Sequence, residues 1–325
     1  MIYQFSILTL LAAIGVAASP STAAQNRKDQ FPDRPIQIVV PFPAGAANDY
    51  TARLIGQNLS DVLSVPVIVE NKTGASGLIA ADSVAAAPAD GYHLLLGTVS
   101  LVTQPTLTGR PTYIPERLIP LGVAVDQQLA LVARSDLAAH DVDSMMAASA
   151  GAPGGLNAAS AGSGTLSHLG WEILRKETGT IVNHVPYRGS TPAMTDLIAG
   201  HADVMIDTIT SALPHLLNGK IKALAALTPE RLAALPEVAT VSEQGYPWLG
   251  FSAWNAFMVP AGTPPEVIRT LHEALTKAIE RPEVAGNLRD RGLLPVVLTP
   301  AGHLEFIQQE AQRWNQVLRD ADVKS

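Results

Sequence analysis

The stretch from Ile36 to Leu59 joins a strand pattern directly to a helix pattern through a loop of small residues. Residues 36–40 are mostly β-branched, which is typical of a buried strand. Two prolines then end the strand, because proline cannot donate to a sheet ladder. The small residues 44–47 follow, and Asn48 is the predicted N-cap of a helix with apolar residues on one face. The sequence therefore predicts a strand–loop–helix unit here.

A unit of this kind can bind an anion at its loop. The start of the helix presents free backbone N–H groups and the positive end of the helix dipole. The alternative is an ordinary βα connection in an α/β sheet, and this stretch alone does not separate the two. Asp49 and Arg53 are spaced as an i,i+4 ion pair on the outer face of the helix.

The same organisation recurs along the first hundred residues. Strand patterns at 65–70 and 92–96 alternate with helical patterns and end in loops rich in Gly, Ser and Thr. Such alternation implies a parallel sheet that binds ligands beyond the carboxyl ends of its strands. The residues expected at that edge are Gly45, Gly74, Gly77, Thr98 and Ser100. Turn chemistry and helix capping are the alternative roles of these residues.

A second small-residue loop, at residues 151–164, also leads into a helix pattern. Leu166, Leu169 and Leu174 share one face of that helix, and Ser163 or Thr165 can cap it. This loop uses the same physical device as the loop at Gly45.

The first residues of the chain resemble an export signal. An apolar tract at 7–18 is too short to span a membrane, and Thr22 and Ala24 suit the small-residue positions of a cleavage site. We expect cleavage after Ala24, so that residues 1–24 are a signal peptide and the mature protein is periplasmic. No Lys or Arg precedes the tract, so an uncleaved anchor or a misplaced start codon stays open.

Composition excludes several classes of function. The net charge of −7 and the lack of a Lys/Arg cluster argue against nucleic-acid binding. The motifs G-x-S-x-G and H-E-x-x-H and the P-loop are not present, and the eight histidines have no metal-ligand spacing. Ser160 and His168 suggest a nucleophile and a base, but no third group is identifiable. We therefore expect neither catalysis, a cofactor nor a metal.

Pieces of sequence in a fixed order carry a family resemblance. They are PFPAGAANDYTAR, ENKTGASG, ADGYHLLLGTVS, SAGSGTLSHL, HVPYRGSTPAMTDLIAGHADVMID, ALPHLLNGKIKALA, LPEVATVSEQG and VPAGTPPEVI. Together they resemble the solute-binding proteins of tripartite tricarboxylate transporters, the Bug family, over nearly the whole mature chain.

The resemblance implies an α/β, two-lobed periplasmic-binding-protein fold. Each lobe is expected to hold a mainly parallel sheet flanked by helices, and the chain is expected to cross between the lobes twice. With crossings near Gln127 and Trp248, lobe 1 is expected to comprise 25–127 with 249–325, and lobe 2 to comprise 128–248.

The resemblance also implies a site in which a ligand carboxylate lies between the loops of the two lobes. One side is expected to hold Phe42, Ala44, Gly45, Ala46 and Asp49. The other is expected to hold Ser160, Gly164, Thr165 and His168. Thr98 and Ser100 would add donors, and Asp207 would line the distal part. Pairing with Arg53 is the alternative role of Asp49, and capping or packing that of His168.

Two departures from the family pattern bear on ligand choice, since Ala46 and Ser76 stand where glycine is usual. The expected ligand is a di- or tricarboxylate, an acidic amino acid or an aromatic carboxylate. The expected function is delivery of this ligand, by a monomer, to membrane transporter subunits. A sensor partner of a membrane signalling protein and a secreted hydrolase are the alternatives.

Overall fold

The structure, a computed structural model, describes residues 31–109, 111 and 113–320. The predicted signal peptide and its cleavage after Ala24 lie outside the described residues. Within the described part, no helix combines the length and the apolar character that crossing a membrane requires.

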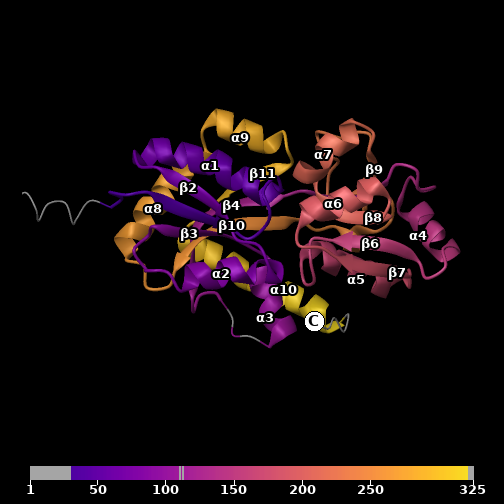
Figure 1. The fold of residues 1–325 in the computed structure, drawn as a ribbon, viewed down its shortest axis with the longest axis horizontal. Helices are drawn as coiled ribbons and strands as arrows, with labels where there is room; N and C mark the ends of the chain where they lie inside the picture. Colours follow the sequence, from indigo (N-terminus) through magenta and orange to yellow (C-terminus); the bar gives the residue numbers. More distant parts are fainter. Residues whose placement is uncertain (1–30, 110, 112, 321–325) are drawn as a thin grey trace, which may run out of the picture.

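Two lobes lie side by side, each built around one sheet (Figure 1). Lobe 1 holds six strands in the order β11-β4-β10-β3-β1-β2, and lobe 2 holds five in the order β7-β6-β8-β5-β9. The strands of lobe 1 are β1 (Ile36–Val40), β2 (Val67–Asn71), β3 (His93–Thr98), β4 (Leu118–Gln127), β10 (Ala253–Pro260) and β11 (Leu293–Val297). Those of lobe 2 are β5 (Leu129–Arg134), β6 (Leu156–Ser160), β7 (Val182–Pro186), β8 (Val204–Thr208) and β9 (Ile221–Ala226).

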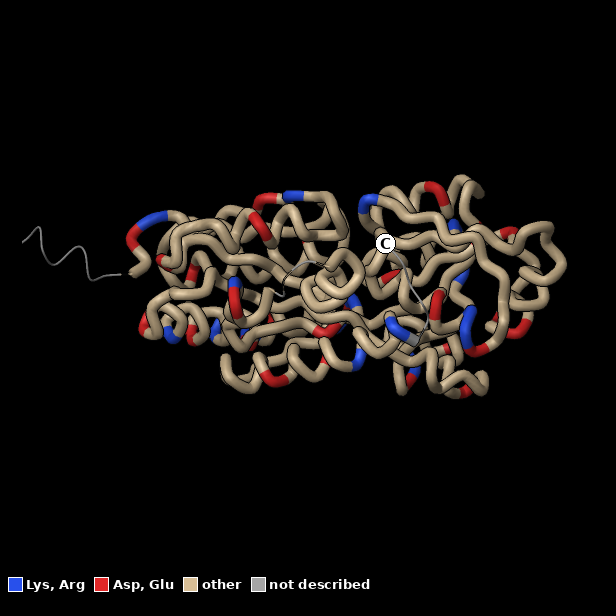
Figure 2. Tube along the Cα trace, turned by 90° about the horizontal axis from the view of Figure 1, so that it is seen from below, with Lys and Arg blue, Asp and Glu red and all other residues tan. Residues whose placement is uncertain are grey.

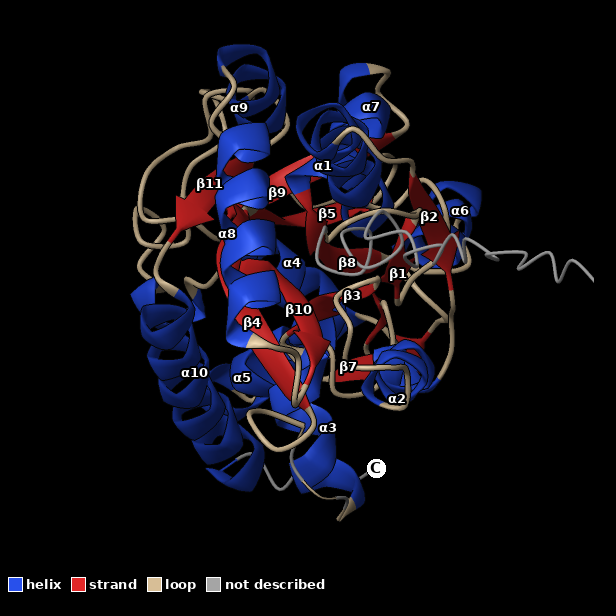
Figure 3. Cartoon of the chain, turned by 90° about the vertical axis from the view of Figure 1, so that its left-hand side faces the viewer, coloured by secondary structure: helices blue, strands red, loops and turns tan. Residues whose placement is uncertain are grey.

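Helices cover both faces of each sheet. Those of lobe 1 are α1 (Ala47–Leu63), α2 (Leu78–Ala85), α3 (Ser100–Thr108), α8 (Pro265–Ile279), α9 (Pro282–Arg289) and α10 (Pro300–Asp320), with the short η1 (Ala75–Gly77). Those of lobe 2 are α4 (Val142–Gly151), α5 (Leu166–Thr178), α6 (Ser190–Ala199) and α7 (Ile209–Leu217), with η2 (Pro247–Leu249). Seen from the end of lobe 1, α8 crosses in front of the sheet and α10 runs beside it (Figure 3).

Both sheets are mixed. The strands β1, β2 and β3 are parallel, as are β6, β7 and β8, which matches the predicted strand–helix units. The antiparallel pairs all involve β4, β5 or β10, the strands at which the chain leaves or enters a lobe. A strand that enters a lobe at the cleft runs opposite to strands that end there. The two-lobed α/β fold is thus confirmed, with mixed sheets.

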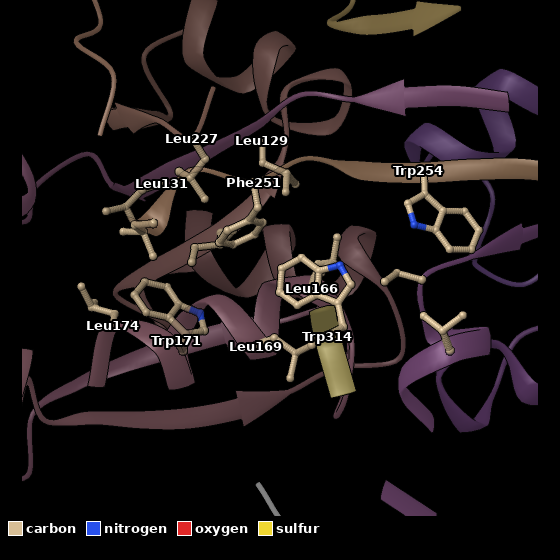
Figure 4. Packing of buried hydrophobic residues seen from close by; sticks show 14 of the residues in the cluster. Leu129, Leu131, Leu166, Leu169, Trp171, Leu174, Leu227, Phe251, Trp254 and Trp314 are labelled. Carbon is tan, nitrogen blue, oxygen red and sulfur yellow. The ribbon is translucent and has the colours of Figure 1, made fainter. Parts of the chain in front are cut away.

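The hydrophobic core shows why the chain folds into these layers. Along β1, Ile36 and Ile38 pack with α1 and α8, while Val39 faces the cluster that holds α2 and α10, because strand side chains alternate between faces. This second cluster continues into lobe 2. At the junction, Trp314 of α10 packs edge-to-face on Phe251, with 5.5 Å between ring centroids (Figure 4).

Charge is spread thinly over both lobes. Lys and Arg are interspersed with Asp and Glu along the chain (Figure 2). The absence of a nucleic-acid partner stays a prediction.

Local predictions around the first loop are partly confirmed. The strand over residues 36–40 has the predicted bounds. The predicted N-cap is wrong: Ala46 occupies that position, without a side-chain cap bond, and Asn48 lies inside the first turn of α1. Asn48 is buried and lines the cavity between the lobes.

Candidate functional site

A cavity of about 70 Å³ lies between the two lobes. Since one water molecule needs about 10–15 Å³ of such space, a small organic molecule fits this cavity. Its walls come from strand ends and from the loops that follow them in both lobes. The lining residues are Phe42, Ala46, Asn48, Thr98, Val99, Ser100, Gln127, Leu129, Ala161, Thr165, Leu166, Ser167, Ser190, Ile206, Asp207, Thr208, Ala253, Trp254 and Asn255. None of these described residues is Lys or Arg.

The β1–α1 loop forms one wall. Phe42 and Ala46 line the cavity directly, and no side chain caps the first N–H groups of α1. Those N–H groups carry the positive end of the helix dipole. Gly45 allows this turn because its φ of +85° is costly for other residues.

Asp49 anchors the same loop. Its Oδ2 accepts from the Gly45 N–H at 3.1 Å, and its Oδ1 accepts from Arg53 Nε and Asn71 Nδ2, both at 3.0 Å. Burial works to raise the pKa of Asp49, but the hydrogen bonds from Arg53, Gly45 and Asn71 outweigh it and hold the pKa below its ordinary value. The Asp49 carboxylate is thus held in place by hydrogen bonds within the protein.

The β6–α5 loop forms the facing wall, and its anchor is a histidine. The Gly164 N–H donates to His168 Nδ1 at 3.0 Å. The ring of His168 stacks on His184 with 4.0 Å between centroids, and His184 Nε2 lies 2.6 Å from Ser160 Oγ. Burial, with a smaller electrostatic effect of the neighbouring His168 ring, lowers the pKa of His184 to about 4. The neutral form of His184 is therefore favoured.

Four polar atoms in the cavity wall have no hydrogen-bond partner among the described residues. They are Ser100 Oγ, Trp254 Nε1, Asn255 Nδ2 and Asp207 Oδ2. Buried polar groups are nearly always paired in native proteins, because an unpaired group costs about 1–3 kcal/mol. Four such atoms around one cavity therefore mark a place built for a polar ligand.

Asp207 differs from the other three because it is an acceptor. Its Oδ1 accepts from Ser190 Oγ at 2.7 Å and from the Thr208 N–H at 2.8 Å, while Oδ2 is unpaired. Burial raises the pKa of Asp207 to about 6, against the lowering effect of the Ser190 and Thr208 hydrogen bonds.

The lobes are closed on the cavity, and direct hydrogen bonds join them. Thr103 Oγ1 donates to the Gly164 carbonyl at 2.8 Å, and Gln104 Nε2 donates to the Ser163 carbonyl at 2.5 Å. Ser76 Oγ also donates to the Ser163 carbonyl, at 2.8 Å. The hydroxyl of Ser76 therefore serves the contact between the lobes, and Ser76 is not among the lining residues.

The structure brings together half of the residues predicted for the ligand. Those in the lining are Phe42, Ala46, Thr98, Ser100, Thr165 and Asp207. Those outside it are Ala44, Gly45, Asp49, Ser160, Gly164 and His168. The second group shapes or joins the two loops: the Ala44 carbonyl, for example, accepts from Thr191 Oγ1 of lobe 2 at 3.4 Å. Contact of either group with a ligand stays a prediction.

Sequence reasoning missed the contribution of the crossing strands. Trp254 and Asn255 lie at the start of β10, and Gln127 is the last residue of β4. The side-chain amide of Gln127 donates to Asn255 Oδ1. The signal was available: polar residues at strand ends beside a predicted lobe crossing. Without the position of the crossing, the local pattern did not distinguish these residues from ordinary strand residues.

The pair of Ser160 and His168 considered in the sequence is not assembled in the structure. Ser160 pairs with His184 rather than His168, is fully buried, and is not part of the lining. Within the described ranges, no group of three or more His, Asp or Glu residues could hold a metal ion.

Two lobes joined by crossing strands and closed over a cavity with unpaired polar groups define the class of solute-binding proteins. The family follows from the sequence: the model of the tripartite tricarboxylate transporter family receptor matches residues 51–323. The chain belongs to this family, which consists of solute-binding proteins and is not a class of enzymes.

Named relatives agree with this assignment. BugT of Bordetella pertussis is 36% identical over 322 residues, which cover 97% of this chain and 98% of BugT. The structure of the periplasmic binding protein BugD has a TM-score of 0.86 at 31% identity, covering 90% of this chain and 99% of BugD. MatC from Rhodopseudomonas palustris with bound malate has a TM-score of 0.82 at 31% identity, covering 89% of this chain and all (100%) of MatC.

Proposed function

We propose that this protein binds a small organic carboxylate between its lobes in the periplasm and delivers it to a tripartite tricarboxylate-type membrane transporter. The observation that carries the proposal is the set of three unpaired donors in the cavity wall: Ser100, Trp254 and Asn255. A carboxylate supplies the acceptors that these donors need. The malate bound to MatC is a carboxylate of this kind.

The grip on the carboxylate is made without an Arg or Lys clamp. Because the described lining holds neither residue, hydrogen-bond donors and the dipole of α1 do the binding. Fixed donors suit this task, since they need no reorganisation when the ligand arrives.

The proposal extends to the organisation of the chain. Lobe 1 comprises 25–127 with 249–325 and lobe 2 comprises 128–248, which is supported by β4 ending at Gln127 and β5 beginning at Leu129. The protein acts as a monomer after export and cleavage at Ala24. Service as the ligand-loaded partner of a membrane signalling protein is the second candidate, because it would use the same closed form.

Two matched variants test the grip. Ser100→Ala removes an unpaired buried hydroxyl from the cavity wall, and Thr51→Val removes one that is buried but not in the lining. A thermal-shift screen of organic acids first finds a ligand, and calorimetry then measures its affinity for each variant. Ser100→Ala should weaken binding by about tenfold to a hundredfold, the effect of about 1–3 kcal/mol. Thr51→Val should leave affinity unchanged.

Arg188→Ala tests whether an ion pair holds the carboxylate instead. Arg188 lies in a groove at the edge of the cleft and not in the cavity lining. If Arg188→Ala abolishes binding while Ser100→Ala is silent, an ion pair holds the carboxylate and the proposal is wrong. Loss of the acid during long incubation would instead indicate an enzyme.

A further inference from the structure

The unpaired polar atoms of the cavity are segregated by lobe. The three donors, on Ser100, Trp254 and Asn255, all belong to lobe 1, where they lie on α3 and at the start of β10. Asp207 Oδ2, which as a carboxylate oxygen can only accept, lies at the end of β8 in lobe 2. A ligand that satisfies both walls must therefore accept hydrogen bonds on one side and donate on the other.

Among the described residues, no group pairs with Asp207 Oδ2. Oδ1 already receives two hydrogen bonds, from Ser190 and Thr208, so only Oδ2 is available. No Lys or Arg belongs to the described lining, and burial and those two hydrogen bonds are the causes that shift its pKa. A buried carboxylate oxygen without a donor is unfavourable, and a donor on the ligand would satisfy it.

We propose that the ligand carries, besides its carboxylate, a hydrogen-bond donor group, a hydroxyl or an ammonium, that binds Asp207 Oδ2. This inference rests on the proposed function and narrows the class of ligand. A second carboxylate in this position would face the Asp207 carboxylate, and two like charges in a buried site repel. A diacid binds well only if it also has a hydroxyl or ammonium group to turn toward Asp207. Malate, for example, has a hydroxyl group.

Matched acids of one chain length test the inference by calorimetry on the full mature chain. Butyrate, γ-hydroxybutyrate, γ-aminobutyrate and succinate share one carboxylate and differ only at the far end. The corresponding valerate and caproate series cover longer spans. In the series that fits best, the hydroxy or amino acid should bind about tenfold more tightly than both the unsubstituted acid and the diacid. The ratio between the hydroxy and the amino acid identifies the donor.

The possible outcomes separate this inference from the proposed function. If the unsubstituted acid or the diacid binds most tightly in every series, the inference is wrong and the carboxylate-binding function stands. If no acid of any series or of the screening panel binds, the proposed function itself fails.

Asp207→Asn gives the reciprocal test. An asparagine keeps the shape and the acceptor for Ser190 and Thr208 but turns an N–H donor toward the cavity. The variant should bind the diacid more tightly than the amino acid, which reverses the order. Asp203→Asn is the matched control, because Asp203 precedes the same strand, pairs with Arg134 and is not in the lining. It should keep the wild-type order, and circular dichroism of both variants verifies folding. An unchanged order in a folded Asp207→Asn protein would overturn the inference.

Discussion

The loops that face each other across the cavity solve one problem with different chemistry. In each, the N–H of a glycine with positive φ donates to the side chain four residues later: Gly45 to Asp49 in lobe 1, and Gly164 to His168 in lobe 2. The acceptor is a carboxylate tied to an arginine in the first case and an imidazole stacked on a second imidazole in the other. The two loops thus share the geometry of this hydrogen bond and differ in the chemical group that accepts it.

The two loops also differ in what they contact. A Cβ added to Gly45 would meet nothing within 4 Å, whereas one added to Gly164 would lie 2.3 Å from Gln104 Nε2 and 2.4 Å from Leu107 Cδ1 of lobe 1. At Gly164 the lobe 2 loop is thus packed against lobe 1, whereas the space beside Gly45 is open, and the lobe 1 loop meets lobe 2 through the Ala44 carbonyl instead. Each difference can be tested by changing both loops in the same way.

Alanine at the two glycines should give the largest contrast. Gly45→Ala and Gly164→Ala share a strain of about 1–2 kcal/mol from positive φ, which should lower the free energy of unfolding of both variants. Only Gly164→Ala crowds α3, and overpacking of about 1–3 kcal/mol predicts a tenfold to hundredfold loss of affinity. Chemical denaturation and calorimetry measure the two quantities. Equal losses of affinity would show that the crowding at Gly164 does not hinder closure.

Changing Asp49 separates an anchor from a ligand contact. Asp49→Asn keeps an oxygen for the Gly45 N–H, whereas Asp49→Ala leaves that N–H without its acceptor, at a cost of about 1–3 kcal/mol of folding free energy. We expect Asp49→Asn to bind the ligand as the wild type does. A large loss of affinity in Asp49→Asn, measured by calorimetry on a folded protein, would show that the charge itself meets the ligand.

Acid should weaken the lobe 2 loop before the lobe 1 loop. The folded-state pKa of His184 lies near 4 instead of 6.5, so its contribution to stability is complete above about pH 6.5 and is lost as the pH falls toward 4. Asp49 has a pKa below 3.8, so its contribution persists through that window. Thermal unfolding between these pH values should show a shallower decline in His184→Gln than in the wild type.

A second buried histidine requires a control in that experiment. Burial also lowers the pKa of His303, in α10, to about 4, so lobe 1 loses stability in the same window. His303→Gln should flatten the pH dependence of unfolding without changing that of ligand affinity. If His303→Gln and His184→Gln change the pH dependence of ligand affinity equally, that dependence does not arise in the lobe 2 loop.

The smallest effect is expected at Ser76. Ser76→Gly removes one exposed hydrogen bond between the lobes but also relieves a residue with φ of 51°. Because a typical hydrogen bond contributes about 0.5–1.5 kcal/mol net, we expect affinity to fall by only a few fold. A change in the preferred acid, seen by thermal shift across the panel, would instead mean that Ser76 acts on the ligand.

The sequence predicted the scaffold better than the roles of side chains. Strand β1 followed from its β-branched run, and both loops followed from small residues before a helix pattern. Asp49 and His168 were recognised as special, and the predicted ion pair of Asp49 with Arg53 is confirmed. Their hydrogen bonds with the backbone N–H groups of Gly45 and Gly164 were not predicted. Spacing along a helix does not tell whether a side chain turns toward the cleft or back to the preceding turn.

Long-range pairing explains what was missed. Trp254 and Asn255 reach the cavity only because β10 pairs with β3 and β4, which lie far away in the sequence. The mixed character of the sheets has the same origin, since the direction of a crossing strand depends on where the lobes meet. Neither property is written in a local pattern.

Two tryptophans near the junction of the lobes can report lobe closure through their fluorescence. Trp254 lines the cavity with an unpaired indole N–H, and Trp314 packs on Phe251 where the lobes meet. Separation of the lobes would bring water to both rings, and the emission of an indole moves to longer wavelength when water surrounds it. Capture of a solute should therefore appear as a blue shift in intrinsic fluorescence, in the unlabelled protein and in real time.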